Sequence, residues 1–454
     1  MLLAINWANV GVQAAQLLLS LSILVILHEF GHYITARWFK CRVEKFYLFF
    51  DPWFSLFKKK VGETEYGIGW LPLGGYVKIS GMIDESMDKD QLKLPPQPYE
   101  FRSKPAWQRL IIMIGGVTVN VILAFIIYAM ILFVWGEDRT PMSSVKNGIW
   151  ITDSLMYDAG LRNGDKIVSI QDKPVTYFED VNKNILTAKK MVIERNGSQK
   201  TIMFPTDLVG KLVESKRRRR LVDLRIPVIV PKFEKDDTTF AAKSGLMEGD
   251  RIVAVDSVNI NFFDEMVPLV EKKKNGTVLL TVNRNGQMVA VTSKVGENGR
   301  IGLGMSEQEV YVKEGLFQVE HLSYGLLEAF PAGVKKTFGK LGDYIEQFKL
   351  ILRPETGAYK GVGGFKSMGS IFPPYWDWQN FWSITAFFSI VLAFMNLLPI
   401  PALDGGHVLF TLIEMITGRK PNEKFLEYAQ IVGMVLLLGL MIYSNGNDWF
   451  GWNK

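Results

Sequence analysis

The residues with the most specific chemistry are His28, Glu29 and His32, which fit the pattern His-Glu-x-x-His. Positions i and i+4 of a helix lie on one face, so the two imidazoles can bind one Zn²⁺ ion. Glu29 is then the candidate general base that deprotonates the attacking water. Residues 10–27, just before the motif, include no charged residue. Ionisable groups at membrane depth are costly and mark functional sites, so the pattern predicts hydrolysis inside a membrane.

A catalytic zinc site needs a third protein ligand and an open position. Asp404 is the candidate, in Leu403-Asp404-Gly405-Gly406-His407, shortly after a segment interrupted by Pro399 and Pro401. A carboxylate at membrane depth in a broken helix requires a partner, and a metal is a suitable one. Taken alone, Asp404 fits equally well as a helix N-cap at the lipid interface. His407 is a candidate neighbour rather than a ligand, because a fourth ligand would close the water position.

Four apolar segments are long enough to position these residues across a bilayer. They lie at about 10–38, 110–135, 381–403 and 425–443, and the last is the shortest. The segment between the first two spans (38–106) holds 11 Lys and Arg residues, and the connection at 405–424 is also basic. The positive-inside rule therefore places both loops in the cytoplasm and places residues 136–380 and both termini outside. On this topology the metal motif lies near the cytoplasmic side. The basic run 216–220 falls in the outer region and is interpreted as a linker, because long domains are translocated regardless of charge.

An internal repeat occupies the outer region. Residues 159–168 (AGLRNGDKIV) match residues 244–253 (SGLMEGDRIV), and each copy is followed by a short alternating strand, at 169–175 and 254–260. Further on, Arg-Asn-Gly recurs at 195–197 and 284–286, and Asn-Gly favours the type I′ turn of a hairpin. The repeat predicts two β-rich modules that resemble PDZ domains in the circularly permuted bacterial arrangement, with Gly160, Leu161, Gly245 and Leu246 as candidate loop residues. PDZ domains accept an extended peptide as an added strand, whereas the alternative is that the modules are spacers.

The His28-Glu29-x-x-His32 motif, together with Leu403-Asp404-Gly405, resembles the site-2 protease family of intramembrane zinc metalloproteases. With four spans and two PDZ-like modules, the chain looks like the bacterial RseP-type members (regulator of sigma-E protease). The resemblance implies that His28, His32 and Asp404 bind one Zn²⁺ ion and that Glu29 is the base. It also implies substrates that are single-span membrane proteins, such as an anti-sigma factor already cut by a first protease. The implied location is the bacterial inner membrane, with the PDZ domains and both termini periplasmic.

Two asparagines extend the candidate site. Asn396 precedes Asp404 on the third span, where its amide can hydrogen-bond a substrate backbone or a developing oxyanion. Its alternative role is helix packing. Asn120 ends Gly115-Gly116-Val117-Thr118-Val119-Asn120, which resembles a G-x-x-N element of the family, although Val117 stands where relatives usually have Pro. Asn120 is expected to contact a metal-site residue or substrate, and the two glycines to permit close helix packing.

Residues 66–79 are apolar, rich in glycine and too broken for a helix. They predict re-entrant β structure near the metal, whose strand edge could pair with an unwound substrate; a simple surface hairpin is the alternative. Segments at 324–338 and 341–352 have the spacing of amphipathic helices lying on the outer membrane surface.

The predicted fold class is a polytopic α-helical membrane protein with four transmembrane helices, a membrane-associated β-hairpin or sheet and two periplasmic β-rich PDZ domains. Its expected segments are span one with the motif (1–38), a cytoplasmic loop with the β region (39–106), span two (107–136), the PDZ domains (137–225 and 226–308), an amphipathic-helix region (309–378), span three (379–404), a cytoplasmic connection (405–424), span four (425–444) and a periplasmic tail (445–454).

Composition and rival functions narrow the interpretation. The net charge is +6, but membrane topology accounts for the basic residues, so nucleic acid is not an expected partner, whereas membrane lipid is. A single cysteine excludes an intrachain disulfide. One rival is a non-catalytic, membrane-anchored PDZ scaffold, and the intact motif argues against it. Another is a metal transporter, whose ligands would lie between repeated helix halves; here the repeat lies outside the spans. Ligand chemistry favours zinc but leaves other divalent metals open.

Overall fold

The computed structural model describes residues 7–72, 74–82, 95–215 and 220–452, and the basic run 216–220 lies outside them except for Arg220. The chain divides into two compact units. Unit 1 consists of residues 1–136, 323–348 and 362–454, and unit 2 of residues 137–322 and 349–361.

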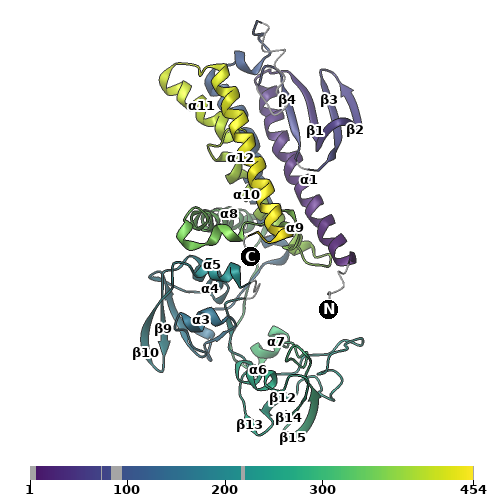
Figure 1. Cartoon of the computed structure of the whole chain (residues 1–454), viewed down its shortest axis with the longest axis vertical. Helices are drawn as coiled ribbons and strands as arrows, with labels where there is room; N and C mark the ends of the chain where they lie inside the picture. Colours follow the sequence, from purple (N-terminus) through teal and green to yellow (C-terminus); the bar gives the residue numbers. More distant parts are fainter. Residues whose placement is uncertain (1–6, 73, 83–94, 216–219, 453–454) are drawn as a thin grey trace. The chain divides into compact units, whose positions relative to one another are not determined.

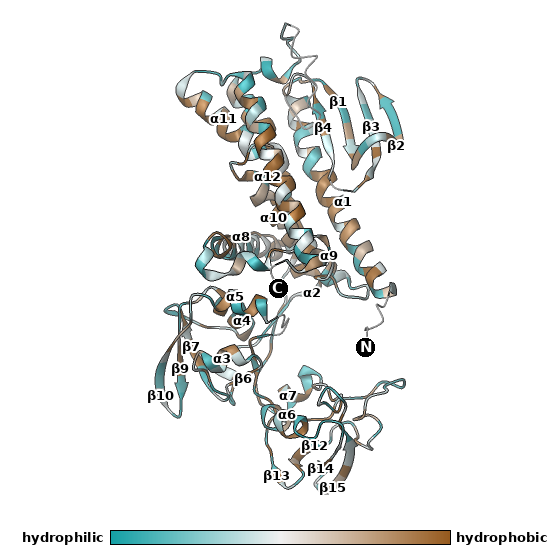
Figure 2. Ribbon diagram, viewed as in Figure 1, coloured by the Kyte–Doolittle hydropathy of each residue, from teal (hydrophilic) through white to brown (hydrophobic). Residues whose placement is uncertain are grey.

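The described residues of unit 1 include four helices that are long and apolar enough to cross a membrane (Figures 1 and 2). They are α1 (Trp7–Trp38), α2 (Ala106–Trp135), α10 (Trp378–Leu397) and α12 (Glu423–Phe450). Each has 20 residues or more, the length that a hydrocarbon core of about 30 Å requires. Their apolar residues predict such helices because a bilayer satisfies no backbone polar group and a helix satisfies its own. Helix α2 packs against both α1 and α10.

The third apolar segment ends earlier than its composition suggests. Helix α10 stops at Leu397, and a new helix, α11 (Asp404–Thr417), begins at the candidate ligand. Pro399 and Pro401 lie between them, and proline cannot donate the backbone hydrogen bond that a continuing helix needs. Asp404 is therefore the first residue of a separate helix, and much of the expected connection 405–424 is helical.

A four-stranded sheet follows α1. It consists of β1 (Val43–Leu48), β2 (Phe50–Val61), β3 (Thr64–Leu71) and β4 (Tyr76–Ile79), in the order β2-β3-β1-β4. Strands β1 and β3 are parallel, and the other neighbours are antiparallel. The β structure predicted for residues 66–79 is therefore two strands of a larger mixed sheet rather than a simple hairpin, and β4 forms one of its edges.

The two amphipathic helices predicted at 324–338 and 341–352 were wrong in number. The structure has one continuous helix, α8 (Leu326–Ile351), because all the residues that join the two segments can adopt a helical conformation. Pro331 lies in its second turn without ending it. A short helix, α9 (Phe365–Gly369), precedes α10.

Unit 2 contains the two repeated β modules. In the first, strands β7 (Lys166–Ile170), β8 (Lys173–Pro174), β9 (Lys190–Arg195) and β10 (Ser198–Met203) form a sheet in the order β10-β9-β7-β8. In the second, β12 (Arg251–Val255), β13 (Val258–Asn259), β14 (Thr277–Arg284) and β15 (Gln287–Lys294) have the equivalent order β13-β12-β14-β15. The remaining elements are α3 (Ser154–Asp158), α4 (Val181–Thr187), α5 (Leu208–Glu214), α6 (Phe263–Glu271), α7 (Gln308–Lys313) and the ladders β6–β11 (Ile149–Ile151 with Val222–Leu224) and β5–β16 (Glu137–Arg139 with Glu320–Leu322).

The repeat predicted one turn correctly and missed another in each module. Both Asn-Gly pairs have positive φ at both residues, as a type I′ hairpin requires: 52° and 76° at Asn196-Gly197, and 52° and 89° at Asn285-Gly286. The runs 169–175 and 254–260 were expected to be single strands. Each instead turns back on itself, between β7 and β8 and between β12 and β13. The reversals pass through Gln171, Asp172 and Asp256, which have positive φ, and neither reversal has the Asn-Gly pair that marks the other two turns.

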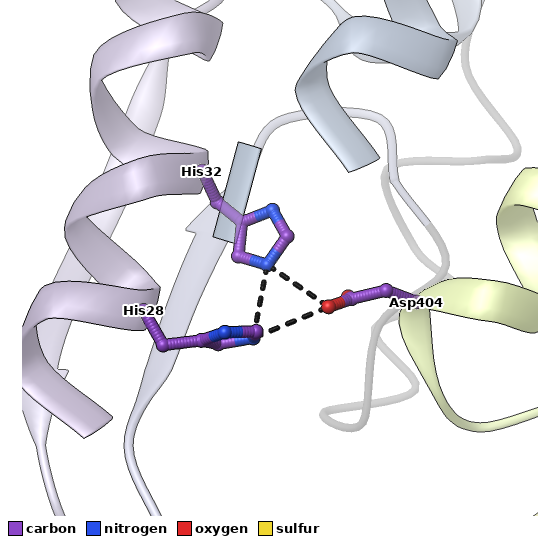
Figure 3. Close-up of side chains that lie close together, drawn as sticks. All are labelled: His28, His32 and Asp404. Atoms are coloured by element: carbon purple, nitrogen blue, oxygen red, sulfur yellow. Dashed lines mark hydrogen bonds and ion pairs between the residues drawn. The ribbon is translucent and has the colours of Figure 1, made fainter. Parts of the chain in front are cut away.

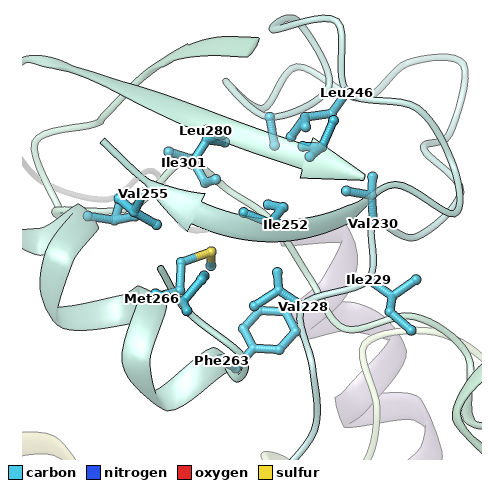
Figure 4. Close-up of a cluster of buried hydrophobic side chains, with 14 of the residues drawn as sticks. Val228, Ile229, Val230, Leu246, Ile252, Val255, Phe263, Met266, Leu280 and Ile301 are labelled. Atoms are coloured by element: carbon cyan, nitrogen blue, oxygen red, sulfur yellow. The ribbon is translucent and has the colours of Figure 1, made fainter. Parts of the chain in front are cut away.

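The candidate loop residues of both modules take part in the packing and hydrogen bonding of their own modules. Leu161 is fully buried and Leu246 nearly so, each in the hydrophobic core of its module (Figure 4 shows the second). The carbonyl of Gly160 accepts a hydrogen bond from Arg195, and that of Gly245 accepts one from Arg284. These arginines also form bidentate pairs with Asp165 and Asp250, respectively. The repeated Gly-Leu-x-x-Gly-Asp segment is thus fixed to the hairpin of its own module, and these contacts connect it to the core.

Candidate metal centre

Helix α1 presents two imidazoles on one face, and the first residue of α11 brings a carboxylate to them (Figure 3). The Nε2 atoms of His28 and His32 are 3.3 Å apart. Each lies 3.2 Å from Oδ2 of Asp404. The three residues predicted as ligands therefore form one group of converging ligand atoms, although Asp404 lies more than 370 positions after the two histidines in sequence.

The histidines are oriented by their other ring nitrogens. Nδ1 of His32 donates to the carbonyl oxygen of Ile112, 2.9 Å away, so its Nε2 keeps a lone pair. Nδ1 of His28 lies 3.1 Å from the side-chain amide of Asn120, which is fully buried. Oδ1 of Asn120 has no hydrogen-bond partner among the described residues. If the amide is turned over, Oδ1 accepts the Nδ1 proton of His28 and leaves Nε2 free in this ring too.

Two glycines of α2 make room for the site. A Cβ on Gly116 would overlap Nε2 of His32 and lie 2.7 Å from Cε1 of His28. A Cβ on Gly115 would lie 2.6 Å from the carbonyl oxygen of Gly31 on α1. The expected close helix packing is present, and at Gly116 it lies directly against the imidazoles.

Glu29 lies beside the ligands, facing the sheet. Its Cγ is 3.3 Å from the Cβ position of Gly75, the residue before β4. Glu29, both histidines and Asp404 line one cavity of about 880 Å³ within unit 1. Most of the other lining side chains are apolar and come from α1, α10 and the sheet, and the residues of β4 also line it. A carboxylate next to the ligands in an apolar cavity is suitably placed to accept a proton from water at the site.

Asn396 and His407 line the same cavity. Nδ2 of Asn396 is 3.2 Å from Nε2 of His28, so this amide lies at the ligand cluster. His407 is not part of that cluster among the described residues. The structure therefore brings Asn120 and Asn396 to His28 from opposite sides, Asn120 at the outer ring nitrogen and Asn396 at the ligand atom.

The arrangement fits a zinc ion. With Zn–N and Zn–O lengths of about 2.0–2.1 Å, two ligands of a tetrahedral site lie about 3.3 Å apart, close to the observed separations. Oδ2 of Asp404 is buried and accepts no hydrogen bond from the described residues. Three electron-rich ligand atoms that converge in a buried site are stabilised by a cation at their centre. Three protein ligands also leave a fourth position open, as catalytic zinc sites require.

Sequence reasoning missed three contributors to this site. They are the carbonyl of Ile112, the space left by Gly116 against the rings, and Gln430, whose Oε1 accepts the backbone N–H of Ala402 at 3.1 Å. The Gly-Gly pair was a visible signal, although it was interpreted as packing alone. A backbone carbonyl gives no signal in sequence, and a lone glutamine in an apolar helix gives a weak one.

The fold and the metal centre define a class, the membrane zinc metalloproteases. The family model Peptidase family M50, which comprises the site-2 proteases, matches residues 16–440, and the chain belongs to this family. It is a zinc metalloprotease of the site-2 type.

Curated relatives match along nearly their whole length. A protein of Rickettsia conorii, provisionally named a zinc metalloprotease, is 30% identical over 95% of this chain and 96% of the relative. One from Treponema pallidum with the same provisional name is 27% identical over 94% and 96%. The regulator of sigma-E protease RseP of Escherichia coli is 27% identical over 96% and 97%.

Proposed function

We propose that this protein is an intramembrane zinc endopeptidase that cleaves the transmembrane segments of single-span membrane proteins near the cytoplasmic side. The observation that carries the proposal is the triangle of His28, His32 and Asp404 ligand atoms, with edges of 3.2–3.3 Å, in an apolar cavity among helices of membrane-spanning length. On this proposal His28, His32 and Asp404 hold the zinc ion, whose presence polarises the scissile carbonyl and acidifies water at the site.

The protein's own groups would then divide the remaining work. Glu29 accepts the proton of the attacking water and passes it to the leaving amine. Asn396 donates its amide hydrogens to the carbonyl oxygen as negative charge develops there. Asn120 acts on His28, holding its ring in the ligand orientation.

The β4 strand is the proposed substrate platform. It pairs only with β1 among the described strands, so it is an edge strand of the sheet, and its residues line the cavity. A helical substrate must unwind before cleavage because its peptide bonds are shielded and hydrogen-bonded. An unwound segment can satisfy its backbone by pairing with this edge. We propose that this sheet lies at membrane depth, covered by protein or water on the side of the metal.

The proposed topology rests on the distribution of basic residues, and the proposed cellular role rests on the similarity to a named relative. The basic loops at 39–106 and 405–424 favour a cytoplasmic position, which leaves unit 2 periplasmic in a bacterial inner membrane. The two modules are proposed to be PDZ domains that admit only substrates whose outer domain has been removed. The relative in Escherichia coli is named a regulator of sigma-E protease. We accordingly propose a trimmed anti-sigma factor as the substrate.

The test is the Glu29→Gln substitution in the full chain, reconstituted with a single-span anti-sigma factor that lacks its outer domain. Cleavage should fall about 10²–10⁴-fold, the usual contribution of a general base, while bound zinc stays at one equivalent. Asp404→Ala should lose both zinc and cleavage. Unchanged cleavage by the Glu29→Gln protein would remove Glu29 from the mechanism.

A further inference from the structure

The turn that leads into Asp404 has an unusual backbone. Between α10 and α11, the N–H of Ile400 donates to Leu398 and that of Leu403 to Ile400, at 2.7 and 3.0 Å. Two prolines in this stretch have no N–H to contribute. Ala402 has a φ of +79°, a conformation that residues other than glycine rarely adopt. Such a residue persists only where its surroundings hold it in place.

Helix α12 supplies that support through a side chain. Oε1 of Gln430 accepts the N–H of Ala402 at 3.1 Å. Gln430 is 7% exposed, so this is a buried contact on an otherwise largely apolar helix. A buried amide that satisfies the N–H of the strained residue stabilises this one conformation of the turn over its alternatives.

The same face of α12 contacts the turn through its backbone. Gly433, one turn beyond Gln430, lies so close that a Cβ would overlap the carbonyl carbon and oxygen of Pro401. Positions i and i+3 lie on one face of a helix, so Gln430 and Gly433 contact consecutive residues of the turn, Ala402 and Pro401. Gly439, further along the same helix, has nothing within 4 Å of its Cβ position. Gly439 is therefore a control position on the same helix.

We propose that Gln430 and Gly433 are positioning residues for the zinc ligand Asp404, acting through Pro401 and Ala402. Asp404 follows Ala402 by two residues and begins α11, so the path of this turn sets where its carboxylate lies. The far part of α11 is fixed independently by an ion pair of Glu414 with Arg109 of α2. The inference rests on the proposed role of Asp404.

The test measures zinc affinity by chelator competition on the full-length protein in detergent, with thermal unfolding of the metal-free protein as the check on folding. Gln430→Met keeps the side-chain size and removes the acceptor oxygen. Gln430→Glu keeps an acceptor. We expect Gln430→Met to weaken zinc binding about 10–100-fold, as loss of supporting contacts around metal ligands does, while the metal-free melting temperature stays near that of the parent. Gln430→Glu should bind zinc within about threefold of the parent, since the hydrogen bond survives.

Gly433→Ala and Gly439→Ala form a second, matched pair. The first should weaken zinc binding at least as much as Gln430→Met, and the second should leave it unchanged. The inference would be overturned if Gln430→Met and Gly433→Ala both bound zinc as tightly as the parent. It would also be overturned if Gln430→Met and Gln430→Glu lost the same amount of zinc affinity. A changed KM with unchanged zinc affinity in Gln430→Met would also overturn it, by assigning Gln430 to substrate. If the parent binds no zinc, or if Asp404→Ala binds it as tightly as the parent, the proposed function fails with it.

Discussion

At the scale of single residues, the metal centre depends on small side chains as well as on ligands. The imidazoles of His28 and His32 occupy space that a side chain at position 116 would take. On the same face of α2, one turn to either side of Gly116, the carbonyl of Ile112 and the side chain of Asn120 hold the outer ring nitrogens. Contacts between α1 and α2 thus hold the two histidine ligands in place without any contribution from α11. Such preorganised ligands bind a metal more tightly.

Gly116→Ala should therefore damage the site although it favours the helix. Alanine stabilises a helix interior by about 0.5–1 kcal/mol relative to glycine, so any loss must come from the methyl group against the rings. We expect zinc affinity and cleavage each to fall at least about tenfold. Gly11→Ala is the matched control, because nothing lies within 4 Å of its Cβ position on α1. Chelator competition and a cleavage assay on both proteins make the comparison, and equal zinc affinity in the two would contradict the packing described.

Residue types predicted the ligand atoms but not their supports. A His-Glu-x-x-His pattern at the end of an uncharged segment strongly favours a metal site, and a carboxylate after two prolines at membrane depth favours it further. The structure brings the ligand atoms of His28, His32 and Asp404 together and places Glu29 in the same cavity, and the catalytic and metal-binding roles of these four residues are proposals. The carbonyl of Ile112 could not be predicted, because every residue has one and only the helix crossing selects this one. Gln430 depends on a contact between segments whose relative position is not encoded locally.

At the scale of elements, the first β module has a closed strand edge. Asn182 of α4 donates to the carbonyl of Val222 on β11 and accepts the N–H groups of Leu221 and Val222. The N–H of Leu224, on the same edge, donates to the carboxylate of Asp223. These side chains satisfy the backbone groups that an added strand would otherwise use.

Asn182→Ala should loosen this edge. Removing the amide leaves buried backbone groups without a hydrogen-bond partner, which costs about 1–3 kcal/mol. Hydrogen exchange of the amides of β11 in the full-length protein should speed up accordingly, by about one to two orders of magnitude. Asn184→Ala, on the same helix, is the control and should leave these amides unaffected. Equal protection in the two variants would show that Asn182 does not hold the strand.

Acid should destabilise the second module through Asp250. Burial alone would raise the pKa of this carboxyl, but hydrogen bonds from Arg284 and the Met247 N–H, with the arginine's charge, hold the pKa below its usual value. A carboxyl whose pKa is lower in the folded state stabilises the fold above its unfolded pKa of about 3.9, and that stability is lost as the pH falls through the folded value. Hydrogen exchange of β12 and β14, corrected for intrinsic rates, should show opening that increases below about pH 4. Asp250→Asn should show a smaller pH dependence, and an unchanged profile would remove Asp250 as the cause.

Element predictions succeeded where periodicity is strong and failed where turns are unusual. The long apolar segments and both Asn-Gly hairpins agree with the structure. The turns through Gln171-Asp172 and at Asp256 were missed because neither has the Asn-Gly pair that marks a type I′ hairpin, although aspartate itself is common in turns. The mixed sheet of β1–β4 was only partly expected, since parallel pairing of β1 with β3 joins segments that no local pattern connects.

At the scale of the whole molecule, the larger part of unit 2, residues 137–322, is an insertion between two segments of unit 1, and the smaller part is residues 349–361. The chain enters the larger part through β5 and leaves it through β16, and these strands pair, with Glu137 opposite Leu322 and Arg139 opposite Glu320. Its entry and exit points are therefore neighbours. The sequence repeat predicted two modules between spans two and three, but it gave no sign that the two ends of this region are held together.

This adjacency makes a clean excision possible. We expect a chain lacking residues 139–320, with its ends joined by a short Gly-Ser linker, to keep zinc binding, because every ligand and cavity residue lies in unit 1. If unit 2 restricts access as proposed, the shortened protein should also cleave a single-span substrate that still has its outer domain, whereas the parent should require the trimmed form. Cleavage of both substrates is measured in lipid vesicles. The rate for the intact substrate divided by the rate for the trimmed substrate should rise toward one on excision. The same excision carrying Glu29→Gln must cleave neither, which excludes a contaminating protease. A shortened protein that binds zinc, cleaves the trimmed substrate and still rejects the intact one would assign the selection to unit 1.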